Sequence, residues 1–190
     1  MKRDRSPLGP PPDAARLREA ALAHLARFAA SEANLRQILT RRITRWANAA
    51  TQAGLDADLI EAAQQKARAS LPSLIAQLRS LGALNDQAFA ESRARRLARS
   101  GKSRNASLAH LTAKGINPDL AASALPPDPA RDLASACILL RRRRLPPFGP
   151  GDRLKTLGIL ARAGFDRATA ENALALDGET AEALIIAARQ

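Results

Sequence analysis

Apolar residues recur every three or four positions along most of the chain, and this spacing predicts amphipathic α-helices. After Asp13, for example, Leu17, Ala21, Leu25 and Phe28 share one helical face, and Asp13 can cap the first turn. Prolines and glycines bound the segments, because proline interrupts a helix and glycine adopts the left-handed conformation that ends one. The predicted helical segments, with their capping and terminating residues, are 13–28, 31–54, 56–71, 72–81, 85–101, 103–115, 118–125, 130–144, 154–163, 168–176 and 179–188.

One helical pattern occurs twice, 49 positions apart. In each copy a helix ends on glycine, an apolar residue follows, and Asn or Asp then favours capping of the next helix. A first copy of the end of this pattern lies at Gly54-Leu55-Asp56. The matched pairs are Leu108 with Leu157, Leu111 with Leu160, Gly115 with Gly164, Ile116 with Phe165, and Leu125 with Leu174.

This repetition predicts an all-α protein built from three tandem three-helix repeats. We expect a disordered, Pro-rich basic tail at residues 1–12 and a first repeat with an extended second helix at 13–80. The second repeat is expected at 81–126, and the third, with a C-terminal helix, at 130–190. The alternative is a generic helical solenoid, although tetratricopeptide and HEAT arrays have shorter periods or aromatic signatures that this chain lacks.

Composition supports packed helices and indicates an acidic partner. Aromatic residues make up 3% of the 190 residues and tyrosine is absent, which argues against a β-sandwich or barrel. The net charge of +12 favours nucleic acid or an acidic protein groove as the partner. The charge is concentrated: residues 84–117 hold seven basic and two acidic side chains, and residues 131–167 hold nine and three.

Two clusters of basic residues are candidate contacts with DNA or with an acidic protein surface. On the helix after Asp86, a helical wheel places three arginines opposite the apolar face, and two further basic residues continue the charge beyond Gly101. The second cluster is a run of four arginines. The alternative for both clusters is a solvated helix face. The candidate residues are Arg95, Arg96, Arg99, Lys102, Arg104, Arg141, Arg142, Arg143 and Arg144.

Several features that could carry chemistry have simpler interpretations. Gly101-Lys102-Ser103 resembles the end of a phosphate-binding loop, but Arg96 stands where that loop needs glycine and a helix precedes it. His24 and His110 have no partner at metal-ligand spacing. We therefore expect no enzymatic activity, no cofactor and no metal site.

The single cysteine, Cys137, excludes an internal disulfide and suits a reducing compartment. The start of the chain has no apolar segment typical of a secretory signal, and Ala134 to Leu140 is too short to cross a bilayer. A cytoplasmic protein without a membrane segment is expected.

The stretch from Leu84 to Ser92, LNDQAFAES, resembles the signature of the bacterial RecX regulatory proteins. The resemblance continues through the basic residues from Arg93 to Arg99, the Gly101-Lys102 step and Lys114-Gly115-Ile116. It covers roughly residues 81–125 most specifically and returns at Arg162 to Phe165.

The resemblance implies an elongated, curved array of three tandem three-helix repeats. It also implies a non-enzymatic modulator of the RecA recombinase in DNA repair, which lies in the groove of the RecA–DNA filament. We expect the protein to be a monomer. Its partners would be the RecA filament and single- and double-stranded DNA, contacted at the phosphates. Capping, groove occupancy and active disassembly of the filament all stay open as ways of inhibiting it.

Two other functions remain as alternatives. A free-standing DNA-binding module is the first, because helix–Gly–helix units resemble helix-turn-helix elements. A helical scaffold that binds another acidic protein is the second. Tight duplex binding without recombinase would favour the first, and an unrelated partner that survives nuclease treatment would favour the second.

Overall fold

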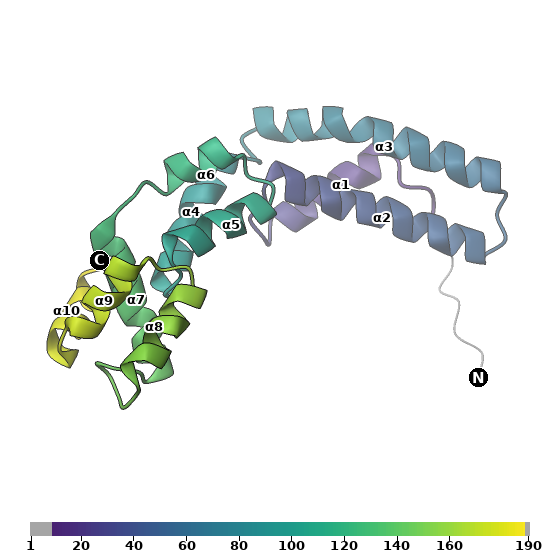
Figure 1. Ribbon diagram of the computed structural model, residues 1–190. Coiled ribbons are helices and arrows are strands. Elements are labelled where there is room, and N and C mark those ends of the chain that lie inside the picture. Colours follow the sequence, from purple (N-terminus) through teal and green to yellow (C-terminus); the bar gives the residue numbers. More distant parts are fainter. Residues whose placement is uncertain (1–8, 189–190) are drawn as a thin grey trace. The chain divides into compact units, whose positions relative to one another are not determined.

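The computed structural model describes residues 9–188, which form ten α-helices and no β-strand (Figure 1). This confirms the predicted all-α class. None of the helices in this part of the chain is long and apolar enough to cross a membrane. The helices are α1 Ala14–Leu25, α2 Glu32–Gln52, α3 Ala57–Ser80, α4 Asp86–Arg99, α5 Arg104–Ala113, α6 Pro118–Ala124, α7 Pro129–Arg143, α8 Arg153–Arg162, α9 Arg167–Ala175 and α10 Gly178–Ala187.

The chain divides into two compact units, and the boundary in the sequence lies between Asp86 and Gln87. In the first unit the long helices α2 and α3 pack together, and α1 packs on both. Leu17, Leu35, Leu39 and Leu78 are almost completely buried between them. These residues recur on the helical faces that the hydrophobic pattern predicts, so burial of one apolar face holds each helix in place.

Helix α3 is continuous through Pro72, whereas the sequence suggested two segments that separate there. Proline costs a helix one backbone hydrogen bond. Here Leu71, Leu74, Ile75 and Leu78 lie on one buried face that spans the proline. Burial of that face on both sides of the proline outweighs the lost hydrogen bond.

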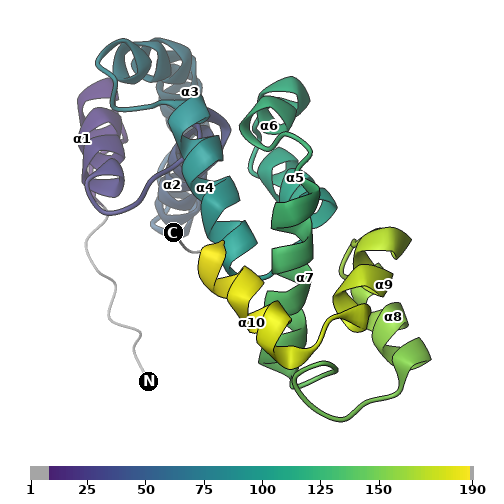
Figure 2. The same ribbon diagram turned by 90° about the vertical axis from the view of Figure 1, so that its left-hand side faces the viewer.

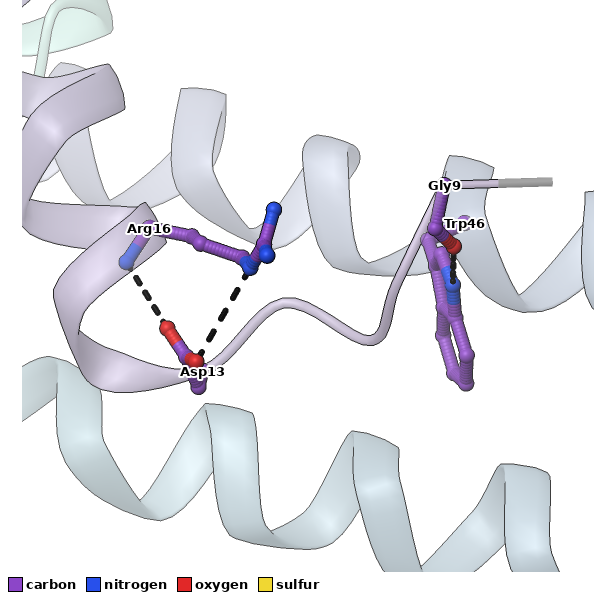
Figure 3. A network of polar contacts seen from close by, with 4 residues as sticks. All are labelled: Gly9, Asp13, Arg16 and Trp46. Atoms are coloured by element: carbon purple, nitrogen blue, oxygen red, sulfur yellow. Dashed lines mark hydrogen bonds and ion pairs between the residues drawn. The ribbon is translucent and has the colours of Figure 1, made fainter. Parts of the chain in front are cut away.

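The segment before α1 packs against α2 in the first unit (Figure 3). The indole Nε1 of Trp46 donates to the carbonyl oxygen of Gly9 at 3.0 Å, and Pro12 is buried. Asp13 caps α1 by accepting from the N–H of Arg16 at 2.8 Å. Residues 9–12 therefore belong to the folded first unit, contrary to the disorder expected for them. Residues 1–8 of the predicted tail lie outside the described residues.

Phe28 does not belong to the buried face of α1, contrary to the sequence pattern. The helix ends at Leu25, so Phe28 leaves the helical face, and its side chain is 55% exposed. The guanidinium of Arg27 lies 5.5 Å from the centre of its ring. The apolar spacing of three and four residues therefore continues to Phe28, although the helix ends at Leu25.

The second unit contains α4 to α10, with α7 at its centre. Helices α9 and α10 both pack on α7, as Figure 2 shows. Cys137, Leu140, Leu160 and Ile185 are fully buried in this core. A smaller core joins α4, α5 and α6 through residues that include Leu111.

The repetition across 49 positions is visible in the second unit as two copies of one arrangement. Ser103 caps α5 and Asp152 caps α8, and each helix is ten residues long. Each helix is followed by a glycine with positive φ, +79° at Gly115 and +85° at Gly164. The helices thus follow in threes, α4–α6 and α7–α9, which agrees with tandem three-helix repeats. The predicted residue boundaries of the three repeats remain a prediction.

Candidate functional site

The turn between α4 and α5 is held tightly against α7. Gly101 has a φ of +76° and ends α4, where its N–H donates to the carbonyl of Ala98 at 2.8 Å. A Cβ at Gly101 would lie 2.9 Å from the backbone nitrogen of Leu139 and from a methyl group of Ile138. Only glycine allows both this conformation and this close approach, so the end of α4 sits directly on α7.

The first turn of α5 is held against the end of α8. The hydroxyl of Ser103 accepts from the N–H of Ala106 at 3.1 Å and donates to the carbonyl of Ala163 at 2.8 Å. The side-chain amide of Asn105 donates to the carbonyl of Gly164 at 3.3 Å. Ser103 is therefore both a helix cap and a link between the two three-helix groups of the second unit.

A cavity of about 410 Å³ lies where α7, α8 and the α4–α5 turn meet. It brings together four cationic side chains, and no carboxylate from the described residues lines it. We call it the basic cavity. Its lining residues are Ser100, Gly101, Lys102, Leu139, Arg142, Arg143, Ile159, Arg162 and Ala163.

Arg142 is held by a hydrogen bond, whereas Arg162 lies against its own helix. A guanidinium nitrogen of Arg142 donates to the carbonyl oxygen of Ser100 at 2.7 Å, which ties the end of α7 to the end of α4. The guanidinium of Arg162 folds back over Gly158, where a Cβ would lie 3.4 Å from Nη1. Lys102, Arg142, Arg143 and Arg162 are all solvent-exposed.

A second hollow, of about 190 Å³, lies between α4, α7 and the end of α10. We call it the α4–α7 groove. Arg95 and Arg99 line it together with Arg131, and Ala98, Ala134 and Ile138 contribute apolar lining. Arg96 is exposed and lines neither hollow.

Besides Arg142, two further candidate residues make internal contacts. The Nε of Arg104 donates to the carbonyl of Leu125 at 2.9 Å, and its backbone N–H donates to Asp132 at 3.1 Å. Arg141 forms an ion pair with Glu182 of α10. Both arginines are half-buried, so their charges are less available to a partner than those of the basic cavity.

Arg144 ends α7 in the left-handed conformation, with a φ of +52°. Its side chain is exposed. Asparagine or glycine is the usual residue at such a helix end, since other side chains are strained there.

Burial shifts the pKa of two titratable groups near the site. Burial is the main cause that lowers the pKa of His110, and the charges of Arg93, Lys114 and Lys102 lower it further. The Nε of Arg93 donates to Nε2 of His110 at 3.0 Å, a contact that requires this nitrogen to be unprotonated. Burial also raises the pKa of Asp132, although the N–H of Arg104 opposes the shift.

The structure brings Lys102, Arg142 and Arg143 together and adds two residues that were not candidates, Arg162 and Arg131. In the sequence, Arg162 stands out only as part of the stretch of family resemblance at Arg162 to Phe165. The signal that could have identified it is the pair Gly158 and Arg162, one helical turn apart, because glycine leaves room for the long side chain to fold back. No group of three or more His, Cys, Asp or Glu side chains in residues 9–188 could hold a metal ion.

Comparison with known proteins identifies relatives of this chain. Residues 85–125 match the sequence model of the second three-helix domain of RecX. The chain is 32% identical over 158 residues to the regulatory protein RecX of Myxococcus xanthus, and the match covers 78% of this chain and 79% of that protein. A crystal structure of RecX from Lactobacillus salivarius matches with a TM-score of 0.46 and 14% identity, over 93% of this chain and 97% of that one.

Proposed function

Because the chain belongs to the RecX family of regulatory proteins, we propose that it regulates a RecA-type recombinase by binding the filament that the recombinase forms on DNA. The single observation that carries the proposal from the structure is the basic cavity, where Lys102, Arg142, Arg143 and Arg162 converge without a lining carboxylate. The cavity lies in the unit that contains the residues matched to the family. A filament of protein on DNA carries phosphates that attract such a surface.

The regulator acts as an inhibitor and carries out no reaction of its own. Bound along the filament groove, it limits filament extension, and thereby ATP hydrolysis and strand exchange. Several exposed cations on the second unit support this mode of action, because several weak contacts on one filament add to a strong one. The protein acts as a monomer in the cytoplasm, where the recombinase filament forms.

The contact surface consists of the exposed cations of the second unit. We assign direct contact with the filament to the basic cavity, to the arginines of the α4–α7 groove, and to Arg96 and Arg144. Arg104 and Arg141 have a structural part in this surface, since they contact Leu125 and Glu182 within the second unit.

The proposal is tested by measuring ATP hydrolysis by RecA on single-stranded DNA, with this protein added below the RecA concentration. The variant Lys102→Glu, Arg143→Glu, Arg162→Glu reverses three exposed charges of the basic cavity and should abolish inhibition while the circular-dichroism signal of the helices is unchanged. The matched control reverses Arg18, Arg36 and Arg68, three exposed arginines of the first unit, and should still inhibit. Inhibition that survives in the first variant would place the interface elsewhere, and no inhibition by the unmodified protein would overturn the proposed function.

A free-standing DNA-binding protein is the second candidate function. The observation that favours it is the same cavity, since four cations attract backbone phosphates whether or not a recombinase is present. Tight binding to a DNA duplex by fluorescence anisotropy, together with no effect on RecA, would select it.

A further inference from the structure

We propose that the α4–α7 groove is a docking site for a short acidic segment of a partner protein, in which large apolar side chains are flanked by carboxylates. The proposal rests on the proposed function only for the identity of the protein that carries this segment. Its physical basis is the lining of the groove, where three arginines surround an apolar floor and no carboxylate from residues 9–188 takes part.

The groove lies between one stripe of α4 and one stripe of α7. On each helix the lining residues recur every three or four positions, which places them on one face. The hydroxyl of Ser135 on α7 donates to the carbonyl of Ala98 on α4 at 3.4 Å, where the two stripes meet. The stripes consist of Arg95, Ala98 and Arg99 on α4, and of Arg131, Ala134, Ser135 and Ile138 on α7.

The floor of the groove is apolar and hollow. It consists of Ala98, Ala134 and Ile138, and Ala188, just beyond α10, adds to the lining. Ala134 and Ile138 are buried, so the core of the second unit fixes their positions. The short alanine side chains leave an open volume of about 190 Å³. Apolar side chains of a ligand suit this hollow, because they lose their contact with water there.

The arginines of α4 carry positive charge that the described part of the chain does not neutralise. Neither Arg95 nor Arg99 forms an ion pair with a carboxylate in residues 9–188. Glu91, one turn earlier on α4, accepts instead from the side-chain amide of Gln87 at 2.5 Å. A carboxylate of a partner can therefore pair with either arginine, so charge complementarity selects an acidic ligand.

A peptide fits the groove better than a nucleic acid does. Phosphates could pair with the arginines, but none of the described residues that line the groove is aromatic, so a base has no ring on which to stack. The apolar floor contributes nothing to a phosphate, whereas it favours a leucine or phenylalanine side chain. The basic cavity is the contrast within the same unit, because four cations line it.

The spacing of the arginines indicates the arrangement of charges on the ligand. Arg95 and Arg99 are four positions apart on α4, so their Cα atoms are separated by about 6 Å along the helix axis. Carboxylates two positions apart in an extended peptide, or four apart in a helix, have nearly the same separation. A short segment with acidic residues on both sides of its apolar residues can therefore engage both arginines while the apolar side chains enter the floor.

The first test uses the full chain and two fluorescein-labelled peptides, GDEDLLDEDG and GDEDSSDEDG, which have the same charge and differ only in the central pair. Binding is measured by anisotropy without recombinase. The unmodified protein should bind the leucine peptide at least about tenfold more tightly than the serine peptide, because only leucine gains from the apolar floor. Equal affinity for the two peptides would overturn the proposal.

The second test removes the two unpaired arginines of the groove. The groove variant Arg95→Gln, Arg99→Gln leaves the half-buried Arg131 in place, and its control, Arg36→Gln, Arg68→Gln, removes two exposed arginines of the first unit. Both variants have the same net charge, and helical circular dichroism and thermal unfolding confirm that both fold. The groove variant should bind the leucine peptide about tenfold more weakly than the control. An equal loss of affinity in both would mean that only net charge matters and would contradict the proposal.

The third test fills the groove without any change of charge. Ala98→Leu places a larger side chain on the floor, and Ala69→Leu, at an exposed position of α3, is its control. Ala98→Leu should weaken binding of the leucine peptide at least about tenfold, whereas Ala69→Leu should leave it unchanged. A folded Ala98→Leu protein that binds the peptide as tightly as its control would show that the peptide lies elsewhere.

A fluorescein-labelled oligo-dT separates a peptide site from a nucleic-acid site. If the groove variant loses affinity for oligo-dT and keeps its affinity for the leucine peptide, the groove takes nucleic acid and the proposal is wrong. Loss of peptide binding supports the proposal whether or not oligo-dT binding also falls. These measurements contain no RecA and leave the basic cavity intact. Inhibition of RecA can therefore persist when the docking site fails, and peptide docking can persist when inhibition fails.

Discussion

The guanidinium of Arg142, at the end of α7, donates a hydrogen bond to the carbonyl oxygen of Ser100, one residue beyond the end of α4, with an N···O distance of 2.7 Å. The carbonyls at the end of a helix have no hydrogen-bond donor within the helix. A cationic side chain from another helix can therefore donate to them favourably. Arg142, one of four consecutive arginines, therefore links two helices, whereas its neighbour Arg143 does not share this hydrogen bond.

The first prediction separates these two arginines by stability. Arg142→Ala should lower the free energy of unfolding by about 0.5–1.5 kcal/mol, because it removes a hydrogen bond between two helices. Arg143→Ala should change it by less than about 0.5 kcal/mol, as is usual for an exposed side chain. Urea denaturation followed by circular dichroism measures both values. Equal values would show that the Ser100 contact does not contribute.

The second prediction concerns the close approach at Gly101. Gly101→Ala should destabilise the second unit by about 2–5 kcal/mol, since a left-handed alanine costs about 1–2 kcal/mol and the overlap with α7 adds about 1–3 kcal/mol. Gly54→Ala is the control: its φ is +80°, but nothing lies within 4 Å of the added carbon. Gly54→Ala should therefore lower the free energy of unfolding only by the about 1–2 kcal/mol of the left-handed conformation. A similar loss for both variants in thermal unfolding would rule out tight packing at Gly101.

The third prediction is a gain in stability at Gly158. This glycine lies inside α8, where alanine is favoured by about 0.5–1 kcal/mol. The added carbon would meet only the mobile end of Arg162, at 3.4 Å. Gly158→Ala should therefore raise the free energy of unfolding in urea and shift the guanidinium slightly. A loss of stability would mean that Arg162 is held firmly over the helix.

The fourth prediction concerns His110 and pH. Its pKa lies below the usual 6.5 in the folded protein, so the unfolded chain takes up a proton more readily than the folded one. The contribution of His110 to stability is therefore complete above about pH 6.5 and is lost as the pH falls through the lowered pKa. The fall in the unfolding midpoint between about pH 7.5 and pH 5.5 should be smaller in His110→Gln.

The matched control for this experiment is His24→Gln in the first unit, whose imidazole does not accept from Arg93. If His110→Gln keeps the full pH dependence of the unmodified protein, the contact between Arg93 and Nε2 of His110 does not link stability to pH.

The fifth prediction uses Cys137 as a reporter of the second unit. Its thiol is completely buried in the core of α7, and burial raises its pKa to about 11. Only the thiolate reacts with disulfide reagents, so labelling near pH 8 should be more than about 100-fold slower than in the denatured chain. Gly101→Ala should accelerate labelling and Gly158→Ala should slow it. Rapid labelling of the unmodified protein would contradict the packing of α7.

Local signals in the sequence predicted most helix limits because capping is a short-range interaction. Asp13, Ser31, Ser103 and Asn117 are helix caps as expected, and the side chain of each accepts from an N–H of the first turn. The end of α1 at Leu25 is one exception, and the break expected at Pro72 is another. The loss of one hydrogen bond at a proline is local, whereas the buried face that carries α3 through it depends on the partner helices.

By itself, the sequence determined that the chain is helical, where glycines end its helices, that a three-helix pattern recurs, and that positive charge gathers in its second half. Each of these follows from neighbours within about one helical turn or from composition. Only the tertiary structure decided which cations share a site. Arg104 and Arg141 contact internal partners. Arg162 and Lys102 line the same cavity although they are 60 positions apart, because the hydrogen bond from Ser103 to Ala163 brings their two helices together. A charge can be counted in a sequence, but whether it is paired or faces a cavity depends on which helices pack together.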